Sequence, residues 1–163
     1  MQIYYAIIFF IFGIVFGSFF NVVSYRLPKE MSLIKPRSHC PKCKKILKPI
    51  DLIPIFSYIF NGGKCRYCKK KISIFYPIIE FITGLIFVLC YLRFGLTINT
   101  AIALVFSSIM IITILSDILY MIVCDEVLIV GGILLFILEI VKNGFNYIPS
   151  LLLDMAISFV FIY

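Results

Sequence analysis

Charged residues are scarce in this sequence. Only 14% of its 163 residues are charged, 63% are apolar, and the mean hydropathy is +1.11. Soluble globular domains are about half apolar and about a quarter charged. The composition therefore excludes an ordinary soluble protein and indicates an integral membrane protein.

The sequence contains several long runs of apolar residues. An α-helix needs about twenty apolar residues to cross a bilayer, and runs that approach or reach this length lie at 3–22, 74–92, 98–115, 127–141 and 148–163. They are too long for the strands of a β-barrel, and only helices and closed barrels satisfy their backbone groups within lipid. The sequence thus predicts an all-α polytopic membrane protein, a helical bundle with about five transmembrane helices.

The marks of a removable signal sequence are also missing. No basic residues precede the first apolar run, and the stretch FGSFFNVVSYRLP that ends it contains no small-residue cleavage site. We therefore expect residues 1–25 to be a retained transmembrane helix. Gly17, Ser18 and Asn21 near its end are expected to let other helices approach closely, because small residues have this effect in membranes.

Basic residues are almost absent outside one part of the chain. Thirteen of the fifteen Lys and Arg residues lie between Arg26 and Lys71, and the formal net charge is +7. Cytoplasmic loops of membrane proteins carry such an excess, so we expect this stretch in the cytoplasm and the protein in the inner (plasma) membrane, crossing it several times. The basic side chains are expected to attract membrane lipids with anionic head groups. No other feature indicates nucleic acid as a partner, and none is expected.

Four of the six cysteines form a pattern typical of a structural zinc site. Cys40 with Cys43, and Cys65 with Cys68, make two C-x2-C pairs separated by twenty-one residues. Each pair can direct both sulfurs at one tetrahedral ion, and four thiolates leave that ion no open position for catalysis. Zinc is therefore expected; disulfides are the alternative, which a reducing cytoplasm disfavours. The other two cysteines lie in or beside apolar runs and are expected to be packing residues.

The few acidic residues are the candidates for chemistry. Asp117 follows the third long apolar run, and Asp125 and Glu126 precede the fourth. Ionisable groups at membrane depth are functional candidates by default, although acids at a helix N-terminus are also favoured by the helix dipole. Hydrolysis by two aspartates needs both carboxyl groups near one water. On one straight helix Asp117 and Asp125 would be about 12 Å apart, so a partner acid is expected from elsewhere, with Glu80 as one candidate.

Several longer motifs make the sequence resemble one family. In chain order they are FGSFFNVVSYRLP, RSHCPKCKKILKPIDLIPIFSYIF, GGKCRYCKKKIS, YPIIEFITG and SDILYMIVCDEVLIVGG. In these motifs the chain resembles the type IV prepilin peptidases, membrane aspartyl endopeptidases that cleave leader peptides from prepilin or pseudopilin precursors and N-methylate the new N-terminus. The resemblance implies a substrate from a type IV pilus or protein secretion system. It also implies S-adenosylmethionine as methyl donor, at a site not assigned to residues.

The resemblance assigns roles to two aspartates. The family's D-x6-P-D element places its first aspartate on Asp117 and its last on Asp125, which implies that Asp117 is catalytic and that Asp125 accompanies it. Cys124 stands where the element has proline. The family's second catalytic aspartate lies in a G-x-G-D motif after a fifth helix, and this motif does not occur in the 163 residues. We therefore expect a C-terminally truncated peptidase that is inactive by itself.

The chain is accordingly expected in three parts. Residues 1–25 are transmembrane helix 1, residues 26–73 are a small cytoplasmic, basic zinc-binding module between helices 1 and 2, and residues 74–163 are the N-terminal part of a membrane peptidase domain. A module of about fifty residues has too little core to be stable on burial alone, so zinc is expected to hold it together. The alternative to an enzyme is a membrane-anchored zinc module that binds a partner or lipid.

Overall fold

Helices make up nearly all of the regular structure in the computed structural model, which describes residues 1–35, 37–40, 42–150, 153 and 157. The long helices are α1 (Gln2–Arg26), α3 (Phe75–Phe94), α4 (Ile98–Tyr120) and α5 (Asp125–Asn143). The short elements are α2 (Phe56–Phe60) and the 3-10 helices η1 (Leu27–Lys29), η2 (Pro49–Leu52) and η3 (Phe145–Tyr147). Isolated β-bridges are the only extended pairing in the described part of the chain. The predicted all-α class is confirmed.

Three helical segments are long and apolar enough to cross a membrane. They are α1 continued through η1 (Gln2–Lys29), α3 and α4. α5 is nearly as long, but acids lie in its first turn and Lys142 lies in its last. Most of the fifth expected segment, 148–163, lies outside the described residues. The described helices nevertheless make the chain a polytopic membrane protein.

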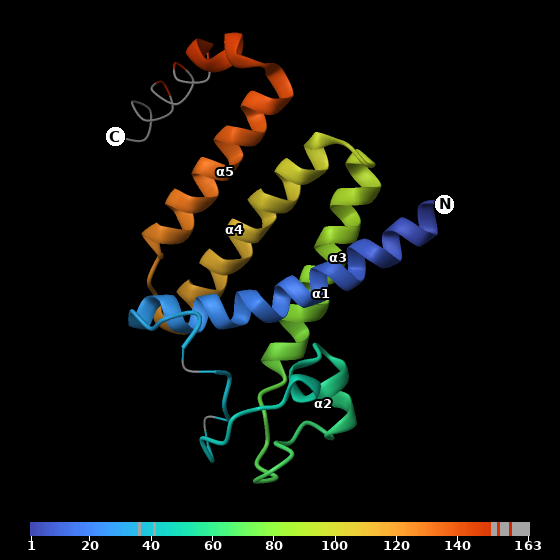
Figure 1. Ribbon diagram of the computed structural model, residues 1–163, viewed down its shortest axis with the longest axis vertical. Coiled ribbons are helices and arrows are strands. Elements are labelled where there is room, and N and C mark those ends of the chain that lie inside the picture. Colours follow the sequence, from blue (N-terminus) through green and yellow to red (C-terminus); the bar gives the residue numbers. More distant parts are fainter. Residues whose placement is uncertain (36, 41, 151–152, 154–156, 158–163) are drawn as a thin grey trace.

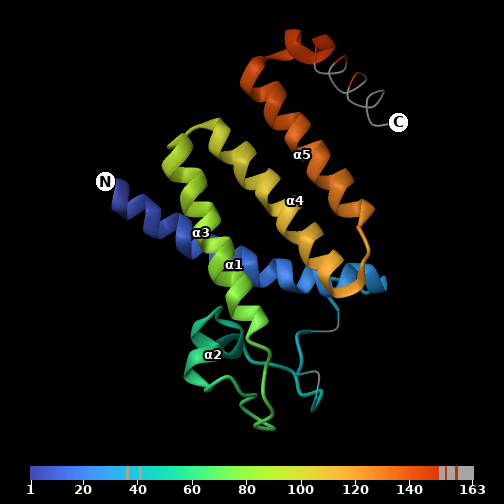
Figure 2. The same cartoon turned by 180° about the vertical axis from the view of Figure 1, so that it is seen from behind.

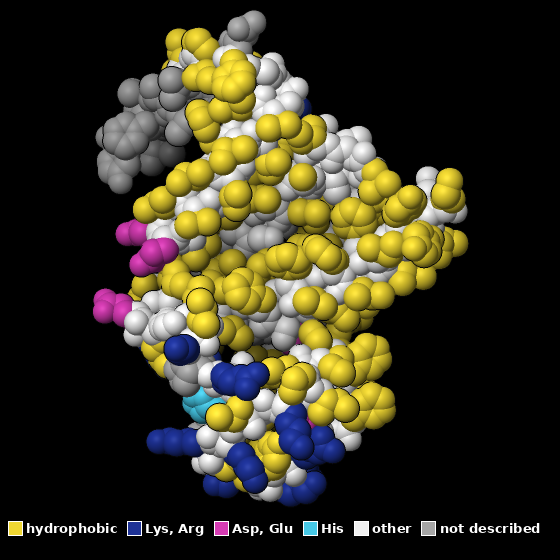
Figure 3. All heavy atoms as spheres, viewed as in Figure 1, with side chains coloured by type: hydrophobic (Ala, Val, Ile, Leu, Met, Phe, Trp, Pro, Cys, Tyr) yellow, Lys and Arg dark blue, Asp and Glu magenta, His cyan; other side chains and the backbone are white. Residues whose placement is uncertain are grey.

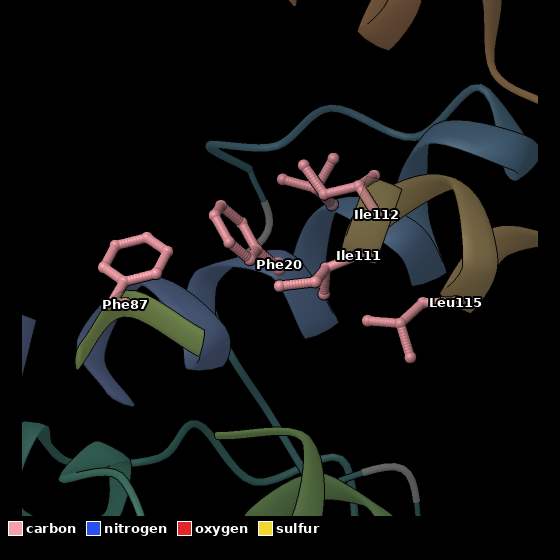
Figure 4. Packing of buried hydrophobic residues seen from close by; sticks show 6 residues of the cluster. Phe20, Phe87, Ile111, Ile112 and Leu115 are labelled. Carbon is pink, nitrogen blue, oxygen red and sulfur yellow. The ribbon is translucent and has the colours of Figure 1, made fainter. Parts of the chain in front are cut away.

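The long helices form one bundle, with the polar part of the chain at one end. α3, α4 and α5 run back and forth beside one another, and α1 crosses α3 (Figure 1, Figure 2). Residues 26–73, called the four-cysteine module below, extend from the end of the bundle where α1 stops and α3 begins (Figure 1). The buried core joins α1, α3 and α4 (Figure 4) and consists of Phe20, Val23, Phe87, Ile111, Ile112 and Leu115.

α1 and α3 approach closely because small residues line their crossing. A Cβ atom added to Gly13 would lie 2.7 Å from the Cα of Gly84, and one added to Gly17 would lie 2.8 Å from the Cα of Glu80. Side-chain carbons do not fit at such distances, so the two backbones touch where Gly13 and Gly17 face α3. Gly17 packs as expected. Gly13 and Gly17 together form a small-xxx-small pattern, which is typical of packed membrane helices. This pattern is visible in the sequence and could have predicted the contact of Gly13.

A larger side chain at this crossing should separate the helices. We expect Gly13→Leu to lower the stability of the detergent-solubilised protein by about 1–3 kcal/mol, the usual effect of overpacking. Gly132→Leu on α5 is the matched control, because nothing lies within 4 Å of a Cβ atom added there. Thermal unfolding followed by circular dichroism measures both variants. Equal melting temperatures would show that the α1–α3 contact is looser than described.

Candidate functional site

The two candidate catalytic aspartates lie on different helices. Asp117 is in the last turn of α4, and Met121, which follows the helix as its C-cap, has the left-handed conformation (φ 55°). Asp125 is the first residue of α5, so the distance along one straight helix does not apply to this pair. Both residues are exposed, and within the described part of the chain neither carboxylate forms a hydrogen bond or an ion pair. Both carboxylates are therefore accessible.

Helix dipoles distinguish these acids. Asp125 and Glu126 lie in the first turn of α5, where a negative charge is stabilised by the positive end of the dipole. Asp117 lies near the C-terminal end of α4, where the same effect disfavours a carboxylate. A stabilising role explains Asp125 and Glu126 but does not explain Asp117. This contrast makes Asp117 the stronger candidate for chemistry.

A buried thiol holds the connection between α4 and α5. The Sγ of Cys124 lies 3.7 Å from the Oγ of Ser116, the residue before Asp117. Cys124 is 5% exposed and Ser116 is fully buried. The expected packing role of Cys124 therefore has a specific target. The contact draws the start of α5 toward the last turn of α4, which positions both aspartates at the same end of the bundle.

A cation between two tyrosines joins the ends of α1 and α4. The Nζ of Lys29 lies 4.1 Å from the ring centroid of Tyr25 and 4.9 Å from that of Tyr120. The two ring centroids are 6.1 Å apart. These are cation–π distances, and Tyr120 lies three residues after Asp117. Lys29 and Tyr120 are far apart in the sequence, so no local sequence pattern predicts this contact.

The four cysteines of the C-x2-C pairs converge. Their sulfur atoms all lie within 4.8 Å of one another, and those of Cys40 and Cys68 are 3.9 Å apart. A tetrahedral zinc ion with Zn–S bonds of about 2.3 Å requires sulfurs about 3.8 Å apart. All six cysteines are free, without disulfides. The donor set and its spacing fit one zinc ion with four thiolate ligands.

The two cysteine turns that carry these ligands have the same backbone structure. In the first, the N–H of Cys40 donates to the carbonyl of Lys45 and the N–H of Lys44 donates to the carbonyl of Cys40. In the second, the equivalent bonds join Cys65 with Lys70 and Lys69 with Cys65. One antiparallel bridge closes each turn, and the residue after each second cysteine has a positive φ, 55° and 57°. Each turn thus presents two sulfurs in the same way.

The thiols of the cluster differ in proton affinity. Burial acts to raise the pKa of Cys40, but the N–H groups of the next residues and the neighbouring thiols lower it to about 6. The N–H of Lys70 acts to lower the pKa of Cys68, but burial and the other three thiols raise it to about 11. Cys40 is thus a thiolate at neutral pH, and a metal ion must displace the proton of Cys68.

Glu80, the candidate partner acid, is engaged elsewhere. It lies in the second turn of α3 and is 7% exposed, and its Oε2 accepts a hydrogen bond of 2.7 Å from the backbone N–H of Ile55. Ile55 has φ 60° and ψ −54°, which β-branched residues rarely adopt and which costs about 1–3 kcal/mol. The carboxylate therefore fastens the four-cysteine module to α3. Among the described residues no contact joins Glu80 to Asp117.

Comparison with known proteins places these features in a family. The sequence profile of the bacterial peptidase A24 N-terminal domain matches residues 11–94, which contain most of α1, the four-cysteine module and α3. The chain belongs to this family. The resemblance to the type IV prepilin peptidases is confirmed by curated relatives, which carry the name prepilin leader peptidase/N-methyltransferase.

The relatives extend beyond the matched part of this chain. The protein from Bacillus subtilis is 42% identical over 122 residues, which are 75% of this chain and 49% of that protein. The proteins from Myxococcus xanthus and Neisseria gonorrhoeae are 40% and 38% identical, over 66% and 52% of this chain and 32% and 38% of their own lengths. The chain thus spans about half, or less, of these relatives. No solved structure matches it.

Proposed function

We propose that this chain is the N-terminal part of a prepilin leader peptidase/N-methyltransferase of the inner membrane. The observation that carries the proposal is Asp117, an accessible carboxylate at a helix end where it adds no stability, in a chain whose relatives bear this name. The excess of basic residues in the four-cysteine module supports a cytoplasmic position for that module and for Asp117. The substrates are then prepilin or pseudopilin precursors.

The proposed reaction uses Asp117 as one of two aspartates. One carboxylate takes a proton from a water molecule, whose oxygen attacks the carbonyl carbon of the scissile peptide bond. The other carboxyl group is protonated and donates a hydrogen bond to the carbonyl oxygen; two close carboxyl groups share one proton in this way. The tetrahedral intermediate then collapses: the C–N bond breaks, and the amine leaves with the proton that the first carboxyl group took from water. Asp125 is proposed to accompany Asp117 by adding negative charge near it. The apolar helix of the precursor would lie in the bilayer, with the cut near the inner face.

The second carboxylate is not assigned to a residue of this chain. Within the described residues no other acid contacts Asp117, and Glu80 is bonded to Ile55. We propose that Asp117 alone does not cleave precursors and that a second aspartate must lie beside it.

Two bound groups complete the proposal. Zinc on Cys40, Cys43, Cys65 and Cys68 would be structural, because all four positions of a tetrahedral ion are then filled by protein. S-adenosylmethionine would supply the methyl group for the new N-terminus of the cleaved precursor. The name of the relatives supports the methyl transfer, and we assign no residues to the donor.

The function is tested with membranes that contain the protein expressed from its natural reading frame. A precursor with a basic leader joined to an apolar helix should lose its leader, and the new N-terminus should be methylated only when S-adenosylmethionine is added. Mass spectrometry identifies both products. A precursor whose apolar helix is replaced by a polar one is the control and should remain intact. If the correctly inserted protein leaves both precursors uncut, the peptidase proposal is wrong.

A further inference from the structure

An exposed apolar surface interrupts the otherwise basic four-cysteine module. It belongs to residues 49–60, which form η2, a short connection and α2. Six large apolar side chains of this segment are between 43% and 83% exposed, namely Ile50, Leu52, Ile53, Phe56, Ile59 and Phe60. Apolar side chains gather over α2, whereas Lys and Arg side chains gather on the lower part of the module (Figure 3). A clustered exposed apolar surface of this kind marks a contact site.

The one charged residue of the segment is buried and paired. The side chain of Asp51 is 6% exposed, and its carboxylate lies 3.6 Å from the guanidinium of Arg66 in the second cysteine turn. Its Oδ2 also accepts a hydrogen bond from the backbone N–H of Lys48. The Asp51–Arg66 pair borders a hollow that Ile50, Ile53, Phe56 and Phe60 also line, so the one acidic charge of the segment is neutralised beside the apolar side chains.

The hydrogen bond between Glu80 and Ile55 fixes the position of residues 49–60 relative to the start of α3. Glu80 belongs to the second turn of α3, which is long and apolar enough to cross a membrane. Because the N–H of Ile55 lies 2.7 Å from its Oε2, the segment lies beside the first turns of a membrane helix. Both ribbon views show α2 next to this end of α3, with the two cysteine turns farther from the bundle (Figure 1, Figure 2).

We propose that residues 49–60 insert into the bilayer surface as an interfacial anchor. The apolar side chains of η2 and α2 lie among the acyl chains of the nearest leaflet, continuous with the lipid-facing surface of α3. The basic side chains next to the segment then meet the head groups; Lys48 directly precedes Pro49, and together with Arg37 and Lys45 it lines a hollow beside that residue. Interfacial segments combine an apolar face with such basic neighbours, and anionic phospholipids attract them.

Glu80 has a positioning role in this arrangement. Its carboxylate holds the N–H of Ile55 at the level of the second turn of α3, in a backbone conformation that the segment would not adopt by itself. The anchor is thus a part of the bundle and does not depend on the peptidase reaction.

The sequence contains no tryptophan, which allows a direct test. Phe60→Trp places a single tryptophan on the proposed anchor, at a side chain that is 83% exposed. Lys70→Trp, in the second cysteine turn and exposed, is the matched control. The full chain is reconstituted in vesicles of phosphatidylcholine and phosphatidylglycerol whose acyl chains carry bromine, a quencher of tryptophan fluorescence. Zinc content verifies that both variants are folded.

The lipid contact predicts opposite results for the two proteins. The Phe60→Trp protein should lose roughly half or more of its emission to bromine about 5–10 Å below the head groups, and aqueous iodide should quench it weakly. The Lys70→Trp protein should respond to iodide and not to bromolipid. If iodide quenches both proteins equally and bromolipid quenches neither, residues 49–60 face water and the proposal is wrong. Shielding of the Phe60→Trp protein only after addition of precursor would identify the precursor as the occupant and overturn the lipid assignment.

The positioning role is tested in the same assay. Adding Glu80→Ala to Phe60→Trp removes the acceptor for Ile55, and bromolipid quenching should fall by roughly half while zinc content is unchanged. Glu80→Gln keeps a carbonyl oxygen at the same place and should restore most of the quenching. Unchanged quenching in the alanine variant would show that the segment finds its depth without Glu80.

Discussion

Asp117→Asn is expected to lower the rate of precursor cleavage by about 10²–10⁴-fold, the usual contribution of a group that transfers a proton in the reaction. Asparagine keeps the size and exposure of the side chain at the end of α4, but it cannot accept a proton from water. The protein expressed from its natural reading frame is assayed in membranes with a precursor in excess. The fold should be unaffected, because the carboxylate of Asp117 forms no bond within the described residues.

Two other acids serve as comparisons. Glu139→Gln removes a carboxylate from the opposite end of α5, where it lies 3.9 Å from the Nζ of Lys142; cleavage should be unchanged. Asp125→Asn should cost about 0.3–1 kcal/mol of stability if the residue only complements the helix dipole, and should also slow cleavage if it accompanies Asp117. Full activity of the Asp117→Asn protein would remove this residue from the mechanism.

Replacing Cys40 and Cys65 by serine is expected to empty the metal site. These residues are the first cysteine of each turn, and both are buried. The wild-type protein should contain about one zinc per chain, and the double variant should contain almost none, because two thiolates cannot hold the ion against solvent. Without the ion the four-cysteine module should become sensitive to protease, since metal binding and folding are coupled in such modules.

Cys90→Ser is the control, because this cysteine belongs to α3 and its Sγ lies 3.7 Å from the Oγ of Ser107, outside the cluster. Its zinc content should equal that of the wild type. For the wild type, zinc should be held at neutral pH and released in acid, because protons compete with the metal for the thiolates. Full zinc content in the double variant, or disulfides within the purified module, would contradict the ligand assignment.

Local patterns in the sequence carried the prediction of the fold class and of the cysteine cluster. Apolar runs predict α1, α3 and α4 because one helix needs only its own length of apolar residues to satisfy the bilayer. The C-x2-C spacing brings two sulfurs together within a single turn, and the structure then brings the two pairs together. These features depend on residues that are close in the sequence, and they are the ones that could be foreseen.

The contacts that organise the site join residues from distant parts of the chain. Two examples are the hydrogen bond from Ile55 to Glu80 and the contact of Lys29 with Tyr120. Both depend on how α1, α3 and α4 pack against one another, and the spacing of residues in the sequence does not predict that packing. Glu80 illustrates the difficulty. A lone acid near the start of a membrane helix was a reasonable partner for Asp117, and its actual bond to a strained backbone could be seen only in three dimensions. The packing of Gly13, in contrast, follows a spacing rule.

The contact of the Lys29 ammonium group with the rings of Tyr25 and Tyr120 connects two parts of the chain that are distant in the sequence. Lys29 belongs to the first residues of the four-cysteine module, whereas Tyr120 closes the helix that carries Asp117. The contact thus connects the end of the α1–η1 segment to the end of α4 without passing through α3. At an exposed site such a contact is weak, so it favours this arrangement of the helix ends without locking it.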